Sequence, residues 1–167
     1  MAELTPQDRL QPALLDRLCD DAPQARQEPR EARVLTRAQL RAAVLRDLGW
    51  LFNATRQGAD FDWTKAPRAE RSVLNFGLPA LSGQTASTLD LVALQQRIRD
   101  AITLFEPRID AATLQVAALA SDAVLDHHNQ IQFEIRGRLW AQPAPLELLL
   151  RTSVDLETGQ VDVHELG

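Results

Sequence analysis

The chain has 167 residues, of which 45% are hydrophobic and 25% charged, and its formal net charge is -5. This length suits one domain with a substantial core, and the acidic balance argues against nonspecific binding to nucleic acid, which requires a basic field. No apolar run approaches the roughly 20 residues that span a bilayer, and the N-terminal stretch lacks the apolar core of a signal peptide, so we expect a cytoplasmic protein without membrane insertion.

The N-terminal residues, 1–35, are predicted to form an arm. Leu10, Leu14, Leu15 and Leu18 recur at helical spacing, which predicts a short amphipathic helix, and a polar, proline-containing linker follows it. An arm this short cannot bury its apolar stripe alone. The stripe therefore docks either on the chain's own domain or on a partner, and the sequence leaves both options open.

The remaining residues, 36–167, are predicted to form a single domain that begins with a helix over about 36–55. Thr36 and Gln39 stand at the spacing of a capping box, in which each side chain bonds a backbone N–H at the helix start. One face of this helix is apolar and is expected to be buried: Leu40, Val44, Leu48, Leu51 and Phe52.

A second helix is predicted over about 89–105, and Pro107 ends it because the residue before a proline is disfavoured in helical geometry. Its expected buried face comprises Leu91, Leu94, Ile98, Ala101, Ile102 and Phe105. The segment between the helices, 57–90, looks irregular, yet it carries many large apolar side chains. We expect it to pack against the rest of the domain.

The last third of the chain has the period of β-strands. Residues 113–119 form a short apolar strand candidate, and apolar and polar side chains alternate over 131–139 and again over 146–154, with a last strand near 161–163. Helices followed by a run of strands indicate an α+β fold. We expect the helices to cover one face of a C-terminal, mainly antiparallel sheet.

Familiar catalytic signatures are absent from the sequence, which contains no phosphate-binding glycine loop, no GxSxG elbow and no HExxH motif. His127 and His128 are adjacent, whereas metal ligands normally converge from spaced positions, so we interpret them as part of a polar hairpin turn. We therefore expect no cofactor, no metal ion and no small-molecule substrate.

Glu106 is the residue most open to a catalytic interpretation. A carboxylate between Phe105 and Pro107 could have a raised pKa and act as a general acid, although a glycosidase also needs a second carboxylate across a cleft. The favoured alternative is structural. Glu106 would then brace the junction between helix and sheet by pairing with Arg108 or with Arg71.

Four segments resemble the TssE family of type VI secretion baseplate proteins, which is related to the wedge protein of contractile-tailed phages. LLDRL at 14–18 is similar to the family's opening SLLDRL, RSVLNFGLP at 71–79 to SVLNYGLP, and FEPRI at 105–109 to FEPRL. The stretch from Arg46 to Arg56 resembles RDLxxLLNTR, but Ala54 widens the spacing of its asparagine and arginine by one residue. The resemblance covers nearly the whole chain.

The resemblance implies a non-enzymatic subunit of the baseplate wedge that joins the wedge to the first ring of the contractile sheath and helps to initiate sheath assembly. Implied partners are TssF and TssG, with TssK as a further candidate, and the sheath proteins TssB and TssC. The implied location is the cytoplasm, in a baseplate docked at the inner membrane complex. Phage relatives labelled lysozyme-like supply the alternative, a peptidoglycan hydrolase that uses Glu106.

Carried onto this sequence, the resemblance and the residue patterns give two sets of site residues. Expected partner contacts are Glu106, Pro107, Arg108, Leu14, Leu15, Leu18, Leu148 and Leu150; expected structural residues are Asn53, Arg56, Arg71, Asn75, Gly77, Pro79 and Phe105. We also expect the strands between about 131 and 165 to offer an unpaired edge to a sheath subunit. A proline or a charge reversal within 146–154 would then abolish sheath assembly and leave a folded monomer.

Overall fold

Two long helices form the helical layer of the computed structural model, which describes residues 12–19, 23–24, 35–57, 61–81, 90–119, 130–141 and 144–166. Helix α2 spans Arg37–Asn53, and its predicted capping box is present: Gln39 N donates to Thr36 Oγ1 at 3.2 Å, and Thr36 N donates to Gln39 Oε1 at 2.8 Å. Helix α4 spans Leu91–Phe105 and ends at Glu106, directly before Pro107. Both helices therefore lie within two residues of their predicted bounds.

Among the described residues, four antiparallel strands form one sheet in the order β1-β2-β3-β4, with β1 at Gln115–Leu119, β2 at Gln130–Leu139, β3 at Leu146–Asp155 and β4 at Val161–Glu165. Each strand pairs antiparallel with its neighbour in sequence. The α+β expectation is confirmed. β3 is a central strand, and β1 and β4 are the two edges.

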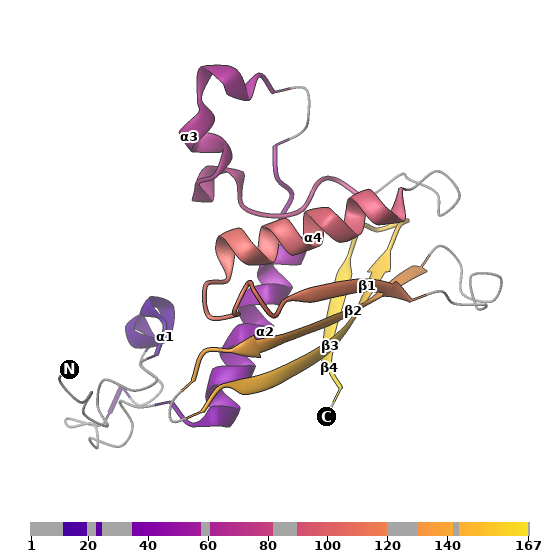
Figure 1. Ribbon diagram of the computed structural model, residues 1–167. Coiled ribbons are helices and arrows are strands. Elements are labelled where there is room, and N and C mark those ends of the chain that lie inside the picture. The colour runs from indigo at the N-terminus through magenta and orange to yellow at the C-terminus, as the bar shows by residue number, and fades with distance from the viewer. Residues whose placement is uncertain are drawn as a thin grey trace.

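The core lies between the helices and one face of the sheet. Helix α2 packs against β4 and α4 against β1, as Figure 1 shows. The alternation places Phe133 opposite Thr152 and Ile135 opposite Leu150, and all four side chains are buried on the helix side. Every predicted face residue of α2 is buried. In α4, Leu94, Ile98, Ala101 and Ile102 are buried as predicted, whereas Phe105 is partly buried and Leu91, in the first turn, is 39% exposed.

The described residues of the segment between α2 and α4, 61–81, contain three short helices: η3 at Trp63–Lys65, α3 at Pro67–Glu70 and η4 at Val73–Asn75. Within 61–81, the residues after η4 pack as expected, since Leu78 and Leu81 join the core. Val73 is 79% and Leu74 82% exposed, which corrects the prediction for the segment's middle. Figure 1 shows α3 and its neighbours standing out beyond α4, away from the sheet.

Helix α1, at Leu14–Leu18, is the predicted helix of the arm, and none of its residues is buried. Its relation to the domain is described with the site below. The paired histidines at 127 and 128 and Leu10 lie outside the described residues. Within the part of the chain that the structure describes, no helix has both the length and the apolar character needed to cross a membrane.

Candidate functional site: a charged pocket at the end of helix α4

Glu106 is locked by its neighbour Arg108 immediately after α4. Its side chain is almost fully buried, and both oxygens accept hydrogen bonds from the guanidinium, Nε to Oε1 at 2.6 Å and Nη2 to Oε2 at 2.5 Å. Pro107 cannot continue the helix, and Ile109 N donates to the Glu106 carbonyl oxygen at 3.1 Å, so the chain turns back on itself here. This turn brings Arg108 over Glu106. The sequence left the partner of Glu106 open between Arg108 and Arg71; in the structure it is Arg108, whereas Arg71 is exposed.

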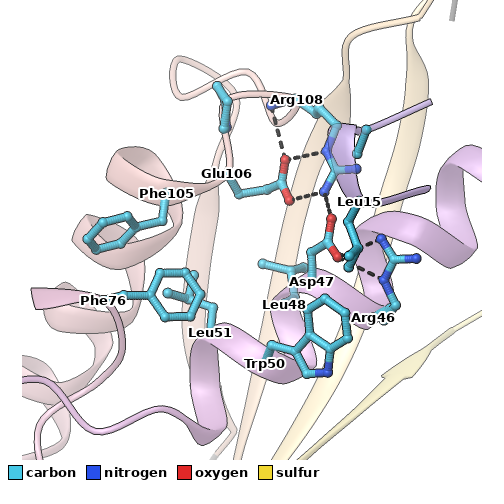
Figure 2. Close-up of a pocket in the computed structure, with 12 residues that line it drawn as sticks. Leu15, Arg46, Asp47, Leu48, Trp50, Leu51, Phe76, Phe105, Glu106 and Arg108 are labelled. Atoms are coloured by element: carbon cyan, nitrogen blue, oxygen red, sulfur yellow. Dashed lines mark hydrogen bonds and ion pairs between the residues drawn. The ribbon is translucent and has the colours of Figure 1, made fainter. Parts of the chain in front are cut away.

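The pair continues into helix α2 and helix α1. Arg108 Nη2 also donates to Asp47 Oδ2 at 2.5 Å, Arg46 Nε donates to Asp47 Oδ1 at 2.9 Å, and Arg46 pairs with Asp16 of α1. We call the series Asp16, Arg46, Asp47, Arg108 and Glu106 the charge chain, and Figure 2 shows its members from Arg46 to Glu106. Its signs alternate from end to end, and it holds one more carboxylate than guanidinium.

Each resolved pKa shift in the charge chain favours the ionised form. Burial by itself lowers the pKa of Arg108, but the hydrogen bonds and charges of Glu106 and then Asp47 outweigh it, and the pKa is raised overall. The hydrogen bond from Arg46 lowers the pKa of Asp16, and the same bond raises the pKa of Arg46. The charge chain therefore acts as a fixed ionic brace between α1, α2 and α4.

A pocket of about 420 Å³ lies beside the charge chain, and its other wall is apolar. Phe76 and Phe105 meet edge to face there, with ring centroids 5.2 Å apart. Trp50 is 51% exposed and has the Arg46 guanidinium 5.0 Å from its ring centroid. Leu15 reaches the pocket from α1, as Figure 2 shows. The site thus combines aromatic and aliphatic surface with fixed charges, which is typical of binding surfaces.

Two residues expected to be structural hold the segment that carries Phe76. Asn75 is buried, and its side chain accepts from Gln57 N at 3.0 Å and donates to the Glu70 carbonyl oxygen at 2.9 Å. Gly77 has φ +119°, and a Cβ there would lie 2.1 Å from the Ala54 carbonyl oxygen. Only glycine fits both the backbone conformation and the space.

The other expected structural residues have different surroundings. The side-chain amide of Asn53 donates to the Val161 carbonyl oxygen at 2.8 Å and accepts from Val161 N at 3.0 Å, which ties the end of α2 to β4. Arg56 N donates to the Leu78 carbonyl oxygen at 2.8 Å, and the Arg56 side chain is half-buried, as is Pro79. Arg71, which the sequence offered as a possible partner of Glu106, takes no part in the charge chain.

The expected partner contacts divide into two groups. Leu14 and Leu18 are 71% and 73% exposed, and Leu15 is 42% exposed, so their side chains are accessible. Leu148 and Leu150 are 2% and 0% exposed, which corrects the prediction for both. They alternate onto the helix side of a central strand and form part of the core, so their side chains are unavailable to a partner.

Some residues of the site were not singled out from the sequence. Asp47, Arg46 and Asp16 complete the charge chain, and Trp50 and Phe76 line the pocket. The available signal was their position inside the segments that carry the family resemblance. Among the described residues, no group of three or more His, Cys, Asp or Glu side chains could hold a metal ion.

Residues 38–144 match the family model described as baseplate wedge protein gp25, which is more than half of the chain. The chain belongs to the gp25 family of baseplate wedge proteins. The match includes α2, the pocket's aromatic wall and the turn after α4, while α1, β3 and β4 lie outside it. Membership in the gp25 family makes this chain a structural component of a phage-tail-like baseplate, and it confirms the wedge resemblance found in the sequence.

One solved structure is similar to this gp25-family chain: a candidate tail lysozyme from Geobacter sulfurreducens, at 16% sequence identity and a TM-score of 0.44. The similarity covers 80% of this chain and 96% of the other. Values this low carry no argument about function. No protein with a curated description matches the sequence.

Proposed function

We propose that this chain is the TssE-like subunit of a type VI secretion baseplate wedge, with no enzymatic activity, located in the cytoplasm in a baseplate docked at the inner membrane complex. It joins the wedge to the first ring of the contractile sheath and helps to initiate sheath assembly. One observation carries the proposal: the four segments with family resemblance, far apart in sequence, all contribute to the charged pocket or its rim.

The chemistry of the pocket favours binding over catalysis. A general acid donates a proton, whereas both oxygens of Glu106 accept hydrogen bonds from Arg108, which stays charged. The nearest second carboxylate, Asp47, shares the same guanidinium and does not face Glu106 across an open cleft. These contacts support a brace that presents a shaped surface, and they weaken the alternative of a peptidoglycan hydrolase.

The wedge partner of this surface would be an amphipathic helix of TssF or TssG, with TssK as a further candidate. Its apolar face would meet Trp50, which is exposed at the pocket, and Leu14 and Leu18, which are exposed on α1, the helix whose Leu15 lines the pocket. The charge chain has one surplus carboxylate, so a lysine or arginine at the rim of the partner helix would complete the alternation. Wedge contact residues in this proposal are Pro107 and Arg108 with the leucines of α1, and the buried Glu106 contributes by holding Arg108 in place.

The sheath contact would be the outer edge of β4. An edge strand has unpaired N–H and C=O groups that can accept a strand from another chain. β3, in contrast, is paired on both sides and has no free edge. The substitution that tests the sheath contact, which the sequence placed within 146–154, therefore belongs in β4. The proposed donors of the added strand are the sheath proteins TssB and TssC.

Co-purification with a TssF–TssG complex tests the wedge surface. We expect Leu14→Ala with Leu18→Ala to reduce recovery of the complex about tenfold, since a combined loss of about 1.4 kcal/mol at the two anchors is a tenfold change in affinity. Val73→Ala with Leu74→Ala is the matched control, because these side chains are equally exposed but lie in η4. Equal recovery with both double variants would overturn the proposed surface.

The enzymatic alternative is tested with the same preparations. We expect purified wild-type protein to leave peptidoglycan intact, as does Glu106→Gln, which keeps the shape of the side chain. Hydrolysis by the wild type that Glu106→Gln abolishes would overturn the non-enzymatic role.

A further inference from the structure

The outer edge of β4 has a defined set of hydrogen-bonding positions. Leu166 N donates to the Leu149 carbonyl oxygen of β3 at 2.9 Å, so even-numbered residues of this segment turn their backbone groups toward β3. Antiparallel pairing alternates, and the odd-numbered residues Val161, Val163 and Glu165 therefore turn theirs away from the sheet. These three positions are where another strand would add.

The first position is already occupied by a side chain. Asn53 donates to the Val161 carbonyl oxygen and accepts from Val161 N, so one amide meets both backbone groups of that residue. A peptide group of a neighbouring strand would offer the same donor and acceptor. The Asn53 amide is itself held in place, because its nitrogen also donates to the Gly49 carbonyl oxygen at 2.8 Å.

The next two positions are open by comparison. Among the described residues, no donor or acceptor meets the outward backbone groups of Val163 and Glu165. Arg41 pairs with the Glu165 side chain, not with its backbone, and also donates to the Glu147 carbonyl oxygen of β3 at 3.0 Å. A helix packs against each edge strand, α2 against β4 and α4 against β1, and at the β1 edge Gln95 accepts from Ala118 N at 3.3 Å. On β4, the outward backbone groups without a partner among the described residues are those of Val163 and Glu165.

We infer that Asn53 is a positioning residue that fixes the register of a strand added to β4. The added strand forms backbone hydrogen bonds with Val163 and Glu165 and ends before Val161. At Val161, the Asn53 side-chain amide takes the place of the next peptide group of that strand. Asp162 is exposed and is the register partner of Ser153 on β3, so a cationic side chain on the added strand would complement its charge. The occupant is one extended segment of a sheath subunit, and this identity rests on the proposed function.

Backbone hydrogen exchange of the isolated chain tests the role of Asn53 without any partner. In the wild type, we expect Val161 N–H to exchange about fivefold more slowly than Val163 N–H and Glu165 N–H, the effect of one net hydrogen bond. Asn53→Ala should remove this difference. Gln95→Ala, the matched control at the other edge, should speed exchange at Ala118 and leave Val161 unchanged. Equal exchange at the three β4 positions in the wild type would overturn the inference.

The same measurement with purified TssB–TssC sheath subunits tests the register. We expect the subunits to protect Val163 and Glu165 in the wild type without further slowing Val161. In Asn53→Ala, protection should extend to Val161, because the added strand can now reach it. Wild-type protection gained at Val161 would mean that the strand displaces Asn53 and would overturn the register role. No protection anywhere on β4 would overturn the sheath contact instead, leaving the isolated-chain result intact.

Discussion

Glu106 shows at the scale of one residue how burial sets the role of a charge. A carboxylate taken out of water is costly unless a cation and hydrogen bonds replace its solvation, and Arg108 supplies both. Sequence alone offered two arginines as partners. The choice between them depends on the turn after α4, which brings Arg108 back over the carboxylate and leaves Arg71 at the surface.

Replacing Arg108 by alanine is expected to lower the free energy of unfolding by about 3 kcal/mol, because it leaves the buried Glu106 carboxylate unpaired. Urea unfolding measures the change. Combining Glu106→Gln with Arg108→Met should recover most of the loss, since neither side chain then carries a charge.

The control for this prediction is Arg138→Ala. Arg138 pairs with Asp110 at 3.7 Å, and both side chains are about half exposed, so we expect a change within about 0.5 kcal/mol. A loss at Arg108 no larger than that at Arg138 would contradict the brace.

Helix α1 shows how a short element depends on a few contacts. It has five residues and no buried side chain, so its own hydrogen bonds cannot keep it folded in isolation. The ion pair between Asp16 and Arg46 and the contact of Leu15 with the pocket fasten it to α2. The two docking options left open by the sequence therefore combine: the domain holds one side of α1, and Leu14 and Leu18 remain for a partner.

The docking of α1 should weaken in acid. The pKa of Asp16 is lowered by its hydrogen bond from Arg46, so the ion pair stabilises the docked helix fully above the ordinary aspartate pKa of about 3.9. That contribution is lost as the pH falls from there through the lower pKa of the docked state. NMR shifts of the α1 amides, followed between pH 6 and the onset of acid unfolding, measure the effect.

Asp16→Asn is the control variant for the titration, because it removes the charge and keeps the size of the side chain. We expect its α1 shifts to lack the wild-type step. Parallel titration curves in the two proteins would show that another group controls the docking.

The whole molecule sets which strand is available to another chain. β3 is ten residues long and buries every second side chain, yet it lies inside the sheet, with Leu150 fully buried. β4 is shorter and carries the open edge. A substitution in β3 therefore disturbs folding before it can report on assembly, whereas β4 allows the two effects to be separated.

Two proline substitutions in β4 separate the effect on folding from the effect on assembly. Val163→Pro removes an N–H that faces the open edge, so we expect a folded chain that no longer initiates sheath assembly with TssB and TssC. His164→Pro removes an N–H that bonds to β3 and should lower the free energy of unfolding by about 2 kcal/mol or more. Urea unfolding and electron microscopy of sheaths give the two readouts. Normal sheaths with folded Val163→Pro would contradict strand addition at this edge.

The sequence by itself determined the features that depend on near neighbours. The capping box at Thr36, the end of α4 before Pro107 and the alternation that buries Phe133 and Leu150 all follow from local geometry and side-chain period. The weakest prediction from the sequence concerned the middle of the segment between the helices, where apolar content did not imply burial of Leu74.

Tertiary structure alone decided which distant groups meet. Alternation shows which side chains share a face, but it cannot show that Leu148 and Leu150 face the core of a central strand and not a partner. Spacing likewise cannot show that Asp47 joins Arg108, or that Asn53 meets Val161. These contacts join residues far apart in sequence, and their formation depends on the packing of the whole chain, which no local pattern encodes.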